Sequence, residues 1–144
     1  MLLKNNRYRL KPNEIAVIQE MRKSEVRNIL VIGDLHEPFC LDGYLEWCKE
    51  QYKVHNCNQV IFIGDIIDAH GFSYHEPDPD GMSSGLELET AIAKIQKWYE
   101  AFPEADVMIG NHDRMASRKA MSGGIPAAWI RSYNEVLGTP NWNW

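Results

Sequence analysis

Three short apolar runs, each ended by a glycine and then by polar residues, constrain the fold of this chain most strongly. The runs cover residues 28–32, 59–63 and 106–109 and are rich in Val and Ile. They are followed in turn by Gly33-Asp34-Leu35-His36, Gly64-Asp65-Ile66-Ile67-Asp68 and Gly110-Asn111-His112-Asp113. Apolar runs of this length that end at glycine are typical of buried strands. If the strands are parallel neighbours, the polar segments meet at one edge of the sheet, where ligands bind in open α/β folds.

Helical periodicity between these runs predicts that strands and helices alternate. Apolar residues recur at helical spacing from Leu41 to Tyr52, and a second amphipathic helix is expected over residues 86–101. The order strand–helix–strand–helix–strand predicts an α/β fold with parallel strands joined by right-handed crossovers. A last helix is expected from Pro126 to the residue before Gly138. Trp142 and Trp144 are expected to be exposed and to lead into a further strand.

Residues 1–26 are predicted to form a polar, basic arm and a short helix. Pro12, followed by apolar residues at helical spacing, indicates a helix that ends at about Lys23. Docking of this helix on the sheet is favoured over a DNA-reading module, because no second helix at turn distance precedes the first strand. Residues 27–144 would form the main domain, since a chain of 144 residues with 44% hydrophobic content can bury a core.

The composition argues against several classes of protein. No apolar stretch approaches the length of a membrane span, and the first residues lack the apolar region of a signal peptide. Cys40, Cys48 and Cys57 are odd in number and are not spaced as metal-binding pairs, which favours reduced thiols and a cytoplasmic location. The net charge of −5 argues against a general nucleic-acid coat but leaves room for a local basic patch.

The polar segments supply residue types that bind divalent metal ions. Asp34 and His36 are two residues apart, so on an extended chain both side chains point the same way and can share one ion. Asp65 can give one oxygen to that ion and the other to a second ion, to which Asn111 adds a neutral oxygen. Two ions about 3.5–4 Å apart activate a water and hold phosphate oxygens for in-line displacement. Mn²⁺ is the expected ion for these ligands, with iron, zinc or nickel as alternatives.

The same segments supply candidates for catalysis and for phosphate binding. His112 could hydrogen-bond a phosphate oxygen or protonate the leaving oxygen. Asp68 or Asp113 could fix the tautomer and orientation of that imidazole, which makes His112 and Asp68 the catalytic candidates. Asn111, His112 and Arg114 are the candidates for substrate binding.

Other polar residues have a simpler explanation. His70 and His75 lie in the long loop expected over residues 69–85, where solvated loop histidines are favoured over extra metal ligands. The acidic residues between Glu76 and Glu87 nearly fit a calcium loop, but the first position is Glu and two prolines interrupt it. A proline-rich turn that caps the next helix explains them better. His55 is expected at the end of the helix before the second strand.

Taken in order, Gly-Asp-x-His, Gly-Asp-x-x-Asp and Gly-Asn-His-Asp resemble the first three motifs of the calcineurin-like metallophosphoesterase superfamily, over about residues 28–113. The resemblance implies that Asp34 and His36 hold the first metal, that Asp65 bridges both metals and that Asn111 holds the second. It also implies that His112 is the catalytic imidazole. The family's fold is a β-sandwich of two mixed sheets flanked by helices, and its members hydrolyse phosphomonoesters or phosphodiesters. His-Glu-Pro-Phe after the first motif resembles phage or bacterial members.

The sequence departs from this family after its third motif. Family members carry a later isolated His and a Gly-His-x-His motif, whereas no histidine follows His112 here. Residues 27–144 therefore resemble the N-terminal half of such a domain, without the second sheet of the sandwich. The first metal site would keep Asp34, His36 and Asp65, and the second would keep only Asp65 and Asn111.

The sequence thus predicts a metal-dependent phosphoesterase, with two alternatives left open. One is a truncated, non-catalytic fragment, or one that a partner chain completes. The other is a nuclease for DNA or RNA in which Arg114, Arg118 and Lys119 contact phosphates. Self-association is also expected, through the apolar face on which a second sheet would pack.

Overall fold

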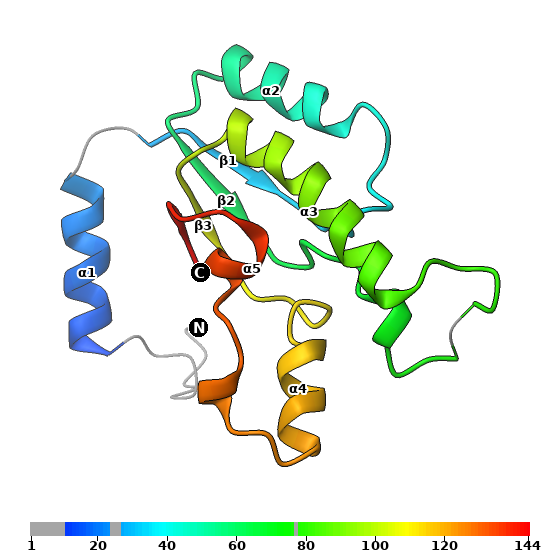
Figure 1. Ribbon diagram of the computed structural model, residues 1–144. Coiled ribbons are helices and arrows are strands. Elements are labelled where there is room, and N and C mark those ends of the chain that lie inside the picture. Colours follow the sequence, from blue (N-terminus) through cyan, green and yellow to red (C-terminus); the bar gives the residue numbers. More distant parts are fainter. Residues whose placement is uncertain (1–10, 24–26, 77) are drawn as a thin grey trace, which may run out of the picture.

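The computed structural model describes residues 11–23, 27–76 and 78–144 (Figure 1). The predicted arm covers residues 1–11, of which residues 1–10 lie outside this range. In chain order the elements are α1 (Pro12–Lys23), β1 (Ile29–Ile32), α2 (Tyr44–Val54), β2 (Gln59–Phe62), η2 (His70–Phe72), α3 (Ser84–Ala101), β3 (Ala105–Val107), α4 (Met115–Ser122), η3 (Ala127–Trp129), α5 (Tyr133–Leu137) and β4 (Trp142–Asn143). Among these helices, none has both the length and the apolar character needed to cross a bilayer.

The strands form one parallel sheet in the order β1-β2-β3-β4. Leu30 pairs with Val60 between β1 and β2, and Ile61 pairs with Asp106 between β2 and β3. The predicted parallel α/β arrangement is confirmed. The fourth strand, β4, pairs in parallel with β3, and Trp142 lies opposite Ala105.

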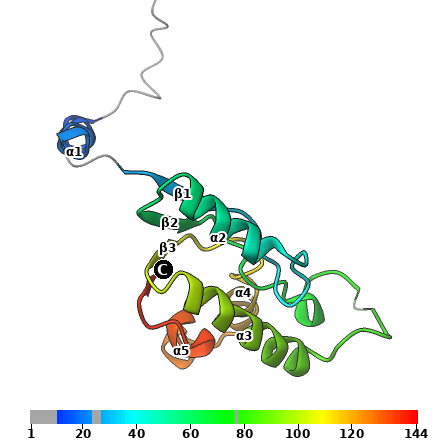
Figure 2. The ribbon, with the colours of Figure 1, turned by 90° about the horizontal axis from the view of Figure 1, so that it is seen from above.

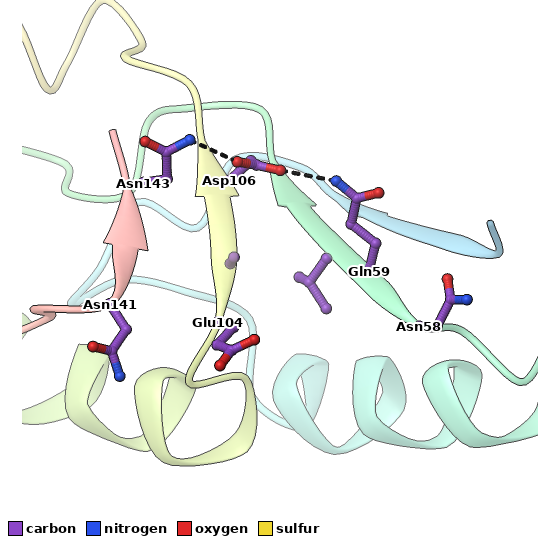
Figure 3. A pocket seen from close by; sticks show the side chains of 8 residues that line it. Asn58, Gln59, Glu104, Asp106, Asn141 and Asn143 are labelled. Carbon is purple, nitrogen blue, oxygen red and sulfur yellow. Dashed lines mark hydrogen bonds between the residues drawn. The ribbon is translucent and has the colours of Figure 1, made fainter. Parts of the chain in front are cut away.

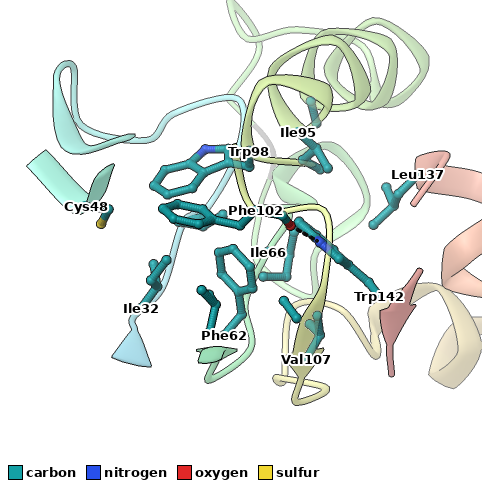
Figure 4. Packing of buried hydrophobic residues seen from close by; sticks show 14 residues of the cluster. Ile32, Cys48, Phe62, Ile66, Ile95, Trp98, Phe102, Val107, Leu137 and Trp142 are labelled. Atoms are coloured by element: carbon teal, nitrogen blue, oxygen red, sulfur yellow. Dashed lines mark hydrogen bonds between the residues drawn. The ribbon is translucent and has the colours of Figure 1, made fainter. Parts of the chain in front are cut away.

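The core lies on one face of the sheet, because alternate strand residues point to the same side. Ile32, Phe62, Val107 and Trp142 from the four strands are buried there. Helices α2, α3 and α5 cover this face with buried side chains, the largest of which is Trp98 of α3 (Figures 2 and 4). Four aromatic residues of this cluster, Phe62, Trp98, Phe102 and Trp142, contact one another ring to ring.

The other face of the sheet is open. Ile29 and Val31 of β1 are exposed there, and Ile63 and Met108, just beyond β2 and β3, are exposed as well. α1 stands away from the sheet in both views, with exposed Ile15 (Figures 1 and 2). The expected docking of this helix on the sheet is therefore wrong for the described residues, whereas self-association through the open face stays a prediction.

A polar group interrupts this open face at the amino-terminal ends of the strands (Figure 3). Asp106 accepts hydrogen bonds from Gln59 at 2.9 Å and from Asn143 at 2.8 Å, which links β2, β3 and β4. These hydrogen bonds, that of Asn143 foremost, hold the pKa of Asp106 below its ordinary value. The hollow beside them lies at the edge opposite to the carboxyl ends of the strands, where ligands bind in such sheets.

Two of the expected helix boundaries are wrong for local reasons. α2 begins at Tyr44, after Gly43 adopts a left-handed conformation, so Leu41 lies outside the helix and is exposed. The helix expected from Pro126 is split, because Ser132 and Glu135 form a capping box that starts α5 anew. Gly138 ends α5 in the left-handed conformation, as predicted. The third strand starts one residue earlier than expected and ends at Val107.

Two other segments differ because tertiary contacts decide them. The basic stretch after residue 113, for which no element was predicted, is the helix α4. Trp142 was expected to be exposed but is 3% exposed. Its ring centroid lies 4.8 Å from that of Phe62, and its indole N–H donates to the carbonyl oxygen of Phe102 at 2.9 Å. His55, by contrast, ends α2 as predicted.

We expect Trp142→Ala to lower the free energy of unfolding by about 3–5 kcal/mol. The substitution empties a packed aromatic site and leaves the buried carbonyl oxygen of Phe102 without its indole donor. Trp129→Ala makes the same chemical change at a side chain that is 81% exposed, and should change stability by less than about 0.5 kcal/mol. Urea unfolding followed by far-UV circular dichroism measures both. Equal effects of the two substitutions would contradict the packing described here.

Candidate metal centre

The three polar segments lie at the carboxyl edge of the sheet, and backbone hydrogen bonds join the first two of them there. The N–H groups of Leu35 and His36 donate to the carbonyl oxygen of Asp65 at 3.0 and 2.9 Å. Glu37 then forms a parallel bridge with Ile67, which extends the pairing of β1 and β2 beyond the strands. The first two segments are thus held side by side.

Three side chains from the three segments converge at this edge. His36, Asp65 and His112 each offer a ligand atom, and these atoms all lie within 4.8 Å of one another. The two imidazole rings meet edge to face, with their centroids 4.5 Å apart. All three residues are partly buried. Two imidazoles and a carboxylate are ligands that suit ions such as Mn²⁺, Fe²⁺ and Zn²⁺, so the residues present fit a divalent metal.

Asp68 orients both imidazoles, each through a different atom. Its carboxylate lies 2.9 Å from Nδ1 of His36, and its main-chain oxygen contacts Nδ1 of His112. A carboxylate and a carbonyl oxygen can only accept, so Nδ1 carries the hydrogen in both rings. Nε2 of each neutral imidazole is then the nitrogen with a free lone pair. Asp68 thus contacts His112, as the sequence led us to expect, but through its main-chain oxygen, whereas its carboxylate contacts His36.

Asp113 holds two of the segments together. Its carboxylate accepts hydrogen bonds from the N–H groups of Asp65 at 2.8 Å, Ile66 at 3.0 Å and Gly110 at 2.8 Å. Burial raises the pKa of this carboxyl, although the backbone donors favour its charged form. Because its oxygens are taken by the backbone, Asp113 does not orient His112, contrary to the second alternative from the sequence.

The backbone at the site adopts conformations that are rare for residues other than glycine. φ is 47° at His36, 50° at Asp65 and 55° at Ala69. Such left-handed residues cost about 1–3 kcal/mol each and persist only where surrounding contacts hold them. The prediction that the chain is extended here, which would align the side chains of Asp34 and His36, is therefore wrong. Asp34 is exposed and lies outside the converging group.

Two glycines allow the second and third segments to touch. A Cβ atom at Gly64 would lie 2.6 Å from the backbone nitrogen of Gly110, and φ of Gly64 is 104°. A Cβ atom at Gly110 would overlap the carboxylate of Asp65. Asp65 Oδ1 in turn accepts the N–H of His112 at 2.8 Å. Backbone contact between these loops sets the position of both side chains.

The remaining predicted site residues lie at the surface around this group. Asn111 is exposed, and Arg114, also exposed, precedes the first residue of α4. The roles assigned to Asp34 and Asn111 as metal ligands, and to Arg114 in substrate binding, stay predictions. His70 and His75 are not part of the converging group.

Glu87 is a buried residue whose structural role the sequence did not reveal. Its carboxylate accepts the N–H groups of His70 and Gly71, both at 2.7 Å, and thereby fixes the turn η2 that follows Asp68. A carboxylate engaged in this way is not available to a calcium loop, and the preference for a capping turn agrees with Ser83, which caps α3. No sequence signal separates Glu87 from an ordinary acidic residue in the first turn of a helix.

Comparison with protein families finds a match. The family model described as calcineurin-like phosphoesterase matches residues 27–143, which is more than half of the chain. A comparison with curated proteins and another with solved structures found no match. The resemblance to phage or bacterial members stays a prediction.

We expect Asp68→Asn to weaken Mn²⁺ binding about 10- to 100-fold, since the carboxylate that orients His36 is lost. Isothermal titration calorimetry with MnCl₂ measures the affinity. Glu104→Gln also removes one carboxylate, but just before β3, at the opposite edge of the sheet, and should leave the affinity unchanged. Equal affinities for the wild type and Asp68→Asn would show that Asp68 does not support a metal ligand.

We expect Asp113→Asn to lower the free energy of unfolding by about 3 kcal/mol, because an amide NH₂ would face buried N–H donors and leave them unpaired. Asp106→Asn is the matched substitution at a solvated carboxylate and should cost less than about 1 kcal/mol. Chemical unfolding monitored by circular dichroism compares the two. A loss at Asp113 no larger than that at Asp106 would refute the role of this carboxylate.

Proposed function

This chain belongs to the calcineurin-like phosphoesterase family, and from this premise we propose that it hydrolyses a phosphomonoester or phosphodiester with the help of two divalent metal ions. Mn²⁺ is the proposed ion, and iron, zinc or nickel are alternatives. The observation that carries the proposal is the convergence of His36, Asp65 and His112 within 4.8 Å at the carboxyl edge of the sheet.

Different residues of the chain would bind the two ions. His36 and Asp65 would hold the first ion, with Asp34 as a further ligand from the same loop as His36. Asp65 and Asn111 would hold the second. Bound ions of this kind lower the pKa of a coordinated water and neutralise the charge of a phosphate. Because the described residues offer the second ion few ligands, we propose that it binds more weakly than the first.

His112 is the proposed contact to the substrate. Its Nδ1–H is engaged by the main-chain oxygen of Asp68, so Nε2 is the atom that can exchange a proton with a phosphate or leaving-group oxygen. Arg114 and Asn111 lie beside it at the surface, where a guanidinium can bind phosphate oxygens with two parallel hydrogen bonds.

A cytoplasmic location is part of the same proposal. All three cysteines are free, and Cys48 is buried in the core. Thiols that stay reduced are typical of proteins in a reducing compartment.

Hydrolysis of bis-p-nitrophenyl phosphate with MnCl₂ tests the proposal. We expect turnover that EDTA abolishes and that Asp65→Asn lowers at least about 100-fold, since this substitution removes the carboxylate proposed to contact both ions. Asp106→Asn, the same substitution on the open face of the sheet, should retain full activity.

The outcomes of these assays distinguish the functions that the sequence predicts. Loss of activity in both variants would mean that the assay reports stability rather than the site. Mn²⁺ binding without turnover would favour the non-catalytic alternative, in which another chain completes the site. Neither binding nor turnover would overturn the proposal for this chain.

A further inference from the structure

Two segments leave the metal centre together and meet again at the surface. The loop after Asp68 runs through η2, and the segment after His112 continues into α4. They rejoin where Lys119 Nζ donates to the carbonyl oxygen of Ser73 at 3.0 Å. Arg118 follows His112 by six residues, so the meeting point is at most about 22 Å along the chain from the imidazole.

Two cations lie close to one aromatic ring at this meeting point. The guanidinium carbon of Arg118 is 5.0 Å from the ring centroid of Tyr74, and Lys119 Nζ is 5.1 Å from it. Both distances are within the range of cation–π contacts. The Tyr74 side chain is nevertheless 55% exposed, so part of the ring remains open to a ligand. The two cation–π contacts hold the ring in place, which reduces the conformational entropy that is lost when a ligand binds.

The segment that carries the two cations is basic, although the net charge of the chain is −5. Residues 114–131 carry four basic residues and no acidic residue, whereas the loop after Tyr74 carries Glu76, Asp78 and Asp80. Arg118 and Lys119, the cations beside the ring, are therefore the groups that would attract a polyanion to this place.

We propose that Tyr74, Arg118 and Lys119 form a docking site for single-stranded nucleic acid beside the metal centre. An unpaired base stacks on the ring of Tyr74, and Arg118 and Lys119 contact the neighbouring phosphates. This inference rests on the proposed phosphoesterase function and narrows its substrate to a polynucleotide whose backbone leads to His112.

The ring favours a nucleic acid over other polyanions. A phosphopeptide or an anionic lipid surface would use the cations but has no base to stack on Tyr74. A duplex is also disfavoured, because its base faces are covered by neighbouring base pairs. Stacking on an aromatic ring is tolerant of sequence, so little base preference is expected.

Fluorescence anisotropy with a fluorescein-labelled oligothymidylate tests the proposal on the whole chain in EDTA, so that no hydrolysis occurs. We expect Tyr74→Leu to weaken binding about tenfold and Tyr74→Phe, which keeps the ring, to bind as the wild type does. Arg118→Gln with Lys119→Gln should reduce the slope of log affinity against log salt by about 1.4, or about 0.7 for each phosphate contact.

A charge-matched control distinguishes binding at this site from general electrostatic attraction to the protein. Lys53→Gln with Lys97→Gln removes two cations near the C-terminal ends of α2 and α3, far from α4 (Figure 1), and should leave binding unchanged. Equal weakening by this control would overturn the proposal. So would binding that depends on the cations but not on the Tyr74 ring, which is expected of a phosphopeptide or lipid site, or equal affinity for a duplex of the same length.

The binding assay is independent of the hydrolysis assay. Turnover of bis-p-nitrophenyl phosphate without oligothymidylate binding would leave the phosphoesterase proposal intact and reject the nucleic-acid site. Oligothymidylate binding that follows the predicted variants, without turnover, would support the docking site and reject catalysis by this chain.

Discussion

The buried carboxylate of Asp113 is the interaction on which the site depends. It accepts backbone N–H groups at Asp65 and Ile66 in one loop and at Gly110 in the next. These amides lie beyond the ends of the strands, so no sheet ladder pairs them, and a buried N–H without a partner is costly. One carboxylate satisfies several of them at once and thereby fixes the distance between the two loops.

The conformation of this backbone determines the positions of the side chains in the metal centre. Gly64 and Gly110 allow the loops to touch, and the left-handed conformation of Asp65 is held by hydrogen bonds to both its N–H and its carbonyl oxygen. Asp68 then sets the tautomer of His36 and of His112. Groups held in this way need little rearrangement when a charged ligand arrives, which is the physical advantage of a preorganised site.

The two faces and the two edges of the sheet have different roles. The aromatic core covers one face and holds four short strands in register, while the other face leaves Val31 and its neighbours exposed. The carboxyl edge carries the converging imidazoles and leads through two segments to the ring of Tyr74. The amino-terminal edge carries the polar group around Asp106. The proposed metal centre and the proposed docking site both lie on the carboxyl side of the sheet.

The sequence by itself determined the parallel α/β order and the three segments that meet at one edge, because strand-forming runs ended by glycine are local signals. It also identified His36, Asp65 and His112 as chemistry-bearing residues, and it predicted the family. It did not determine what Asp113, Asp68 and Glu87 contact, since an aspartate or glutamate has the same local signature whether it binds a metal, a backbone amide or water. Only the tertiary structure decided these partners, and it buried Trp142 as well, because burial and hydrogen bonding across many residues depend on which loops and strands become neighbours.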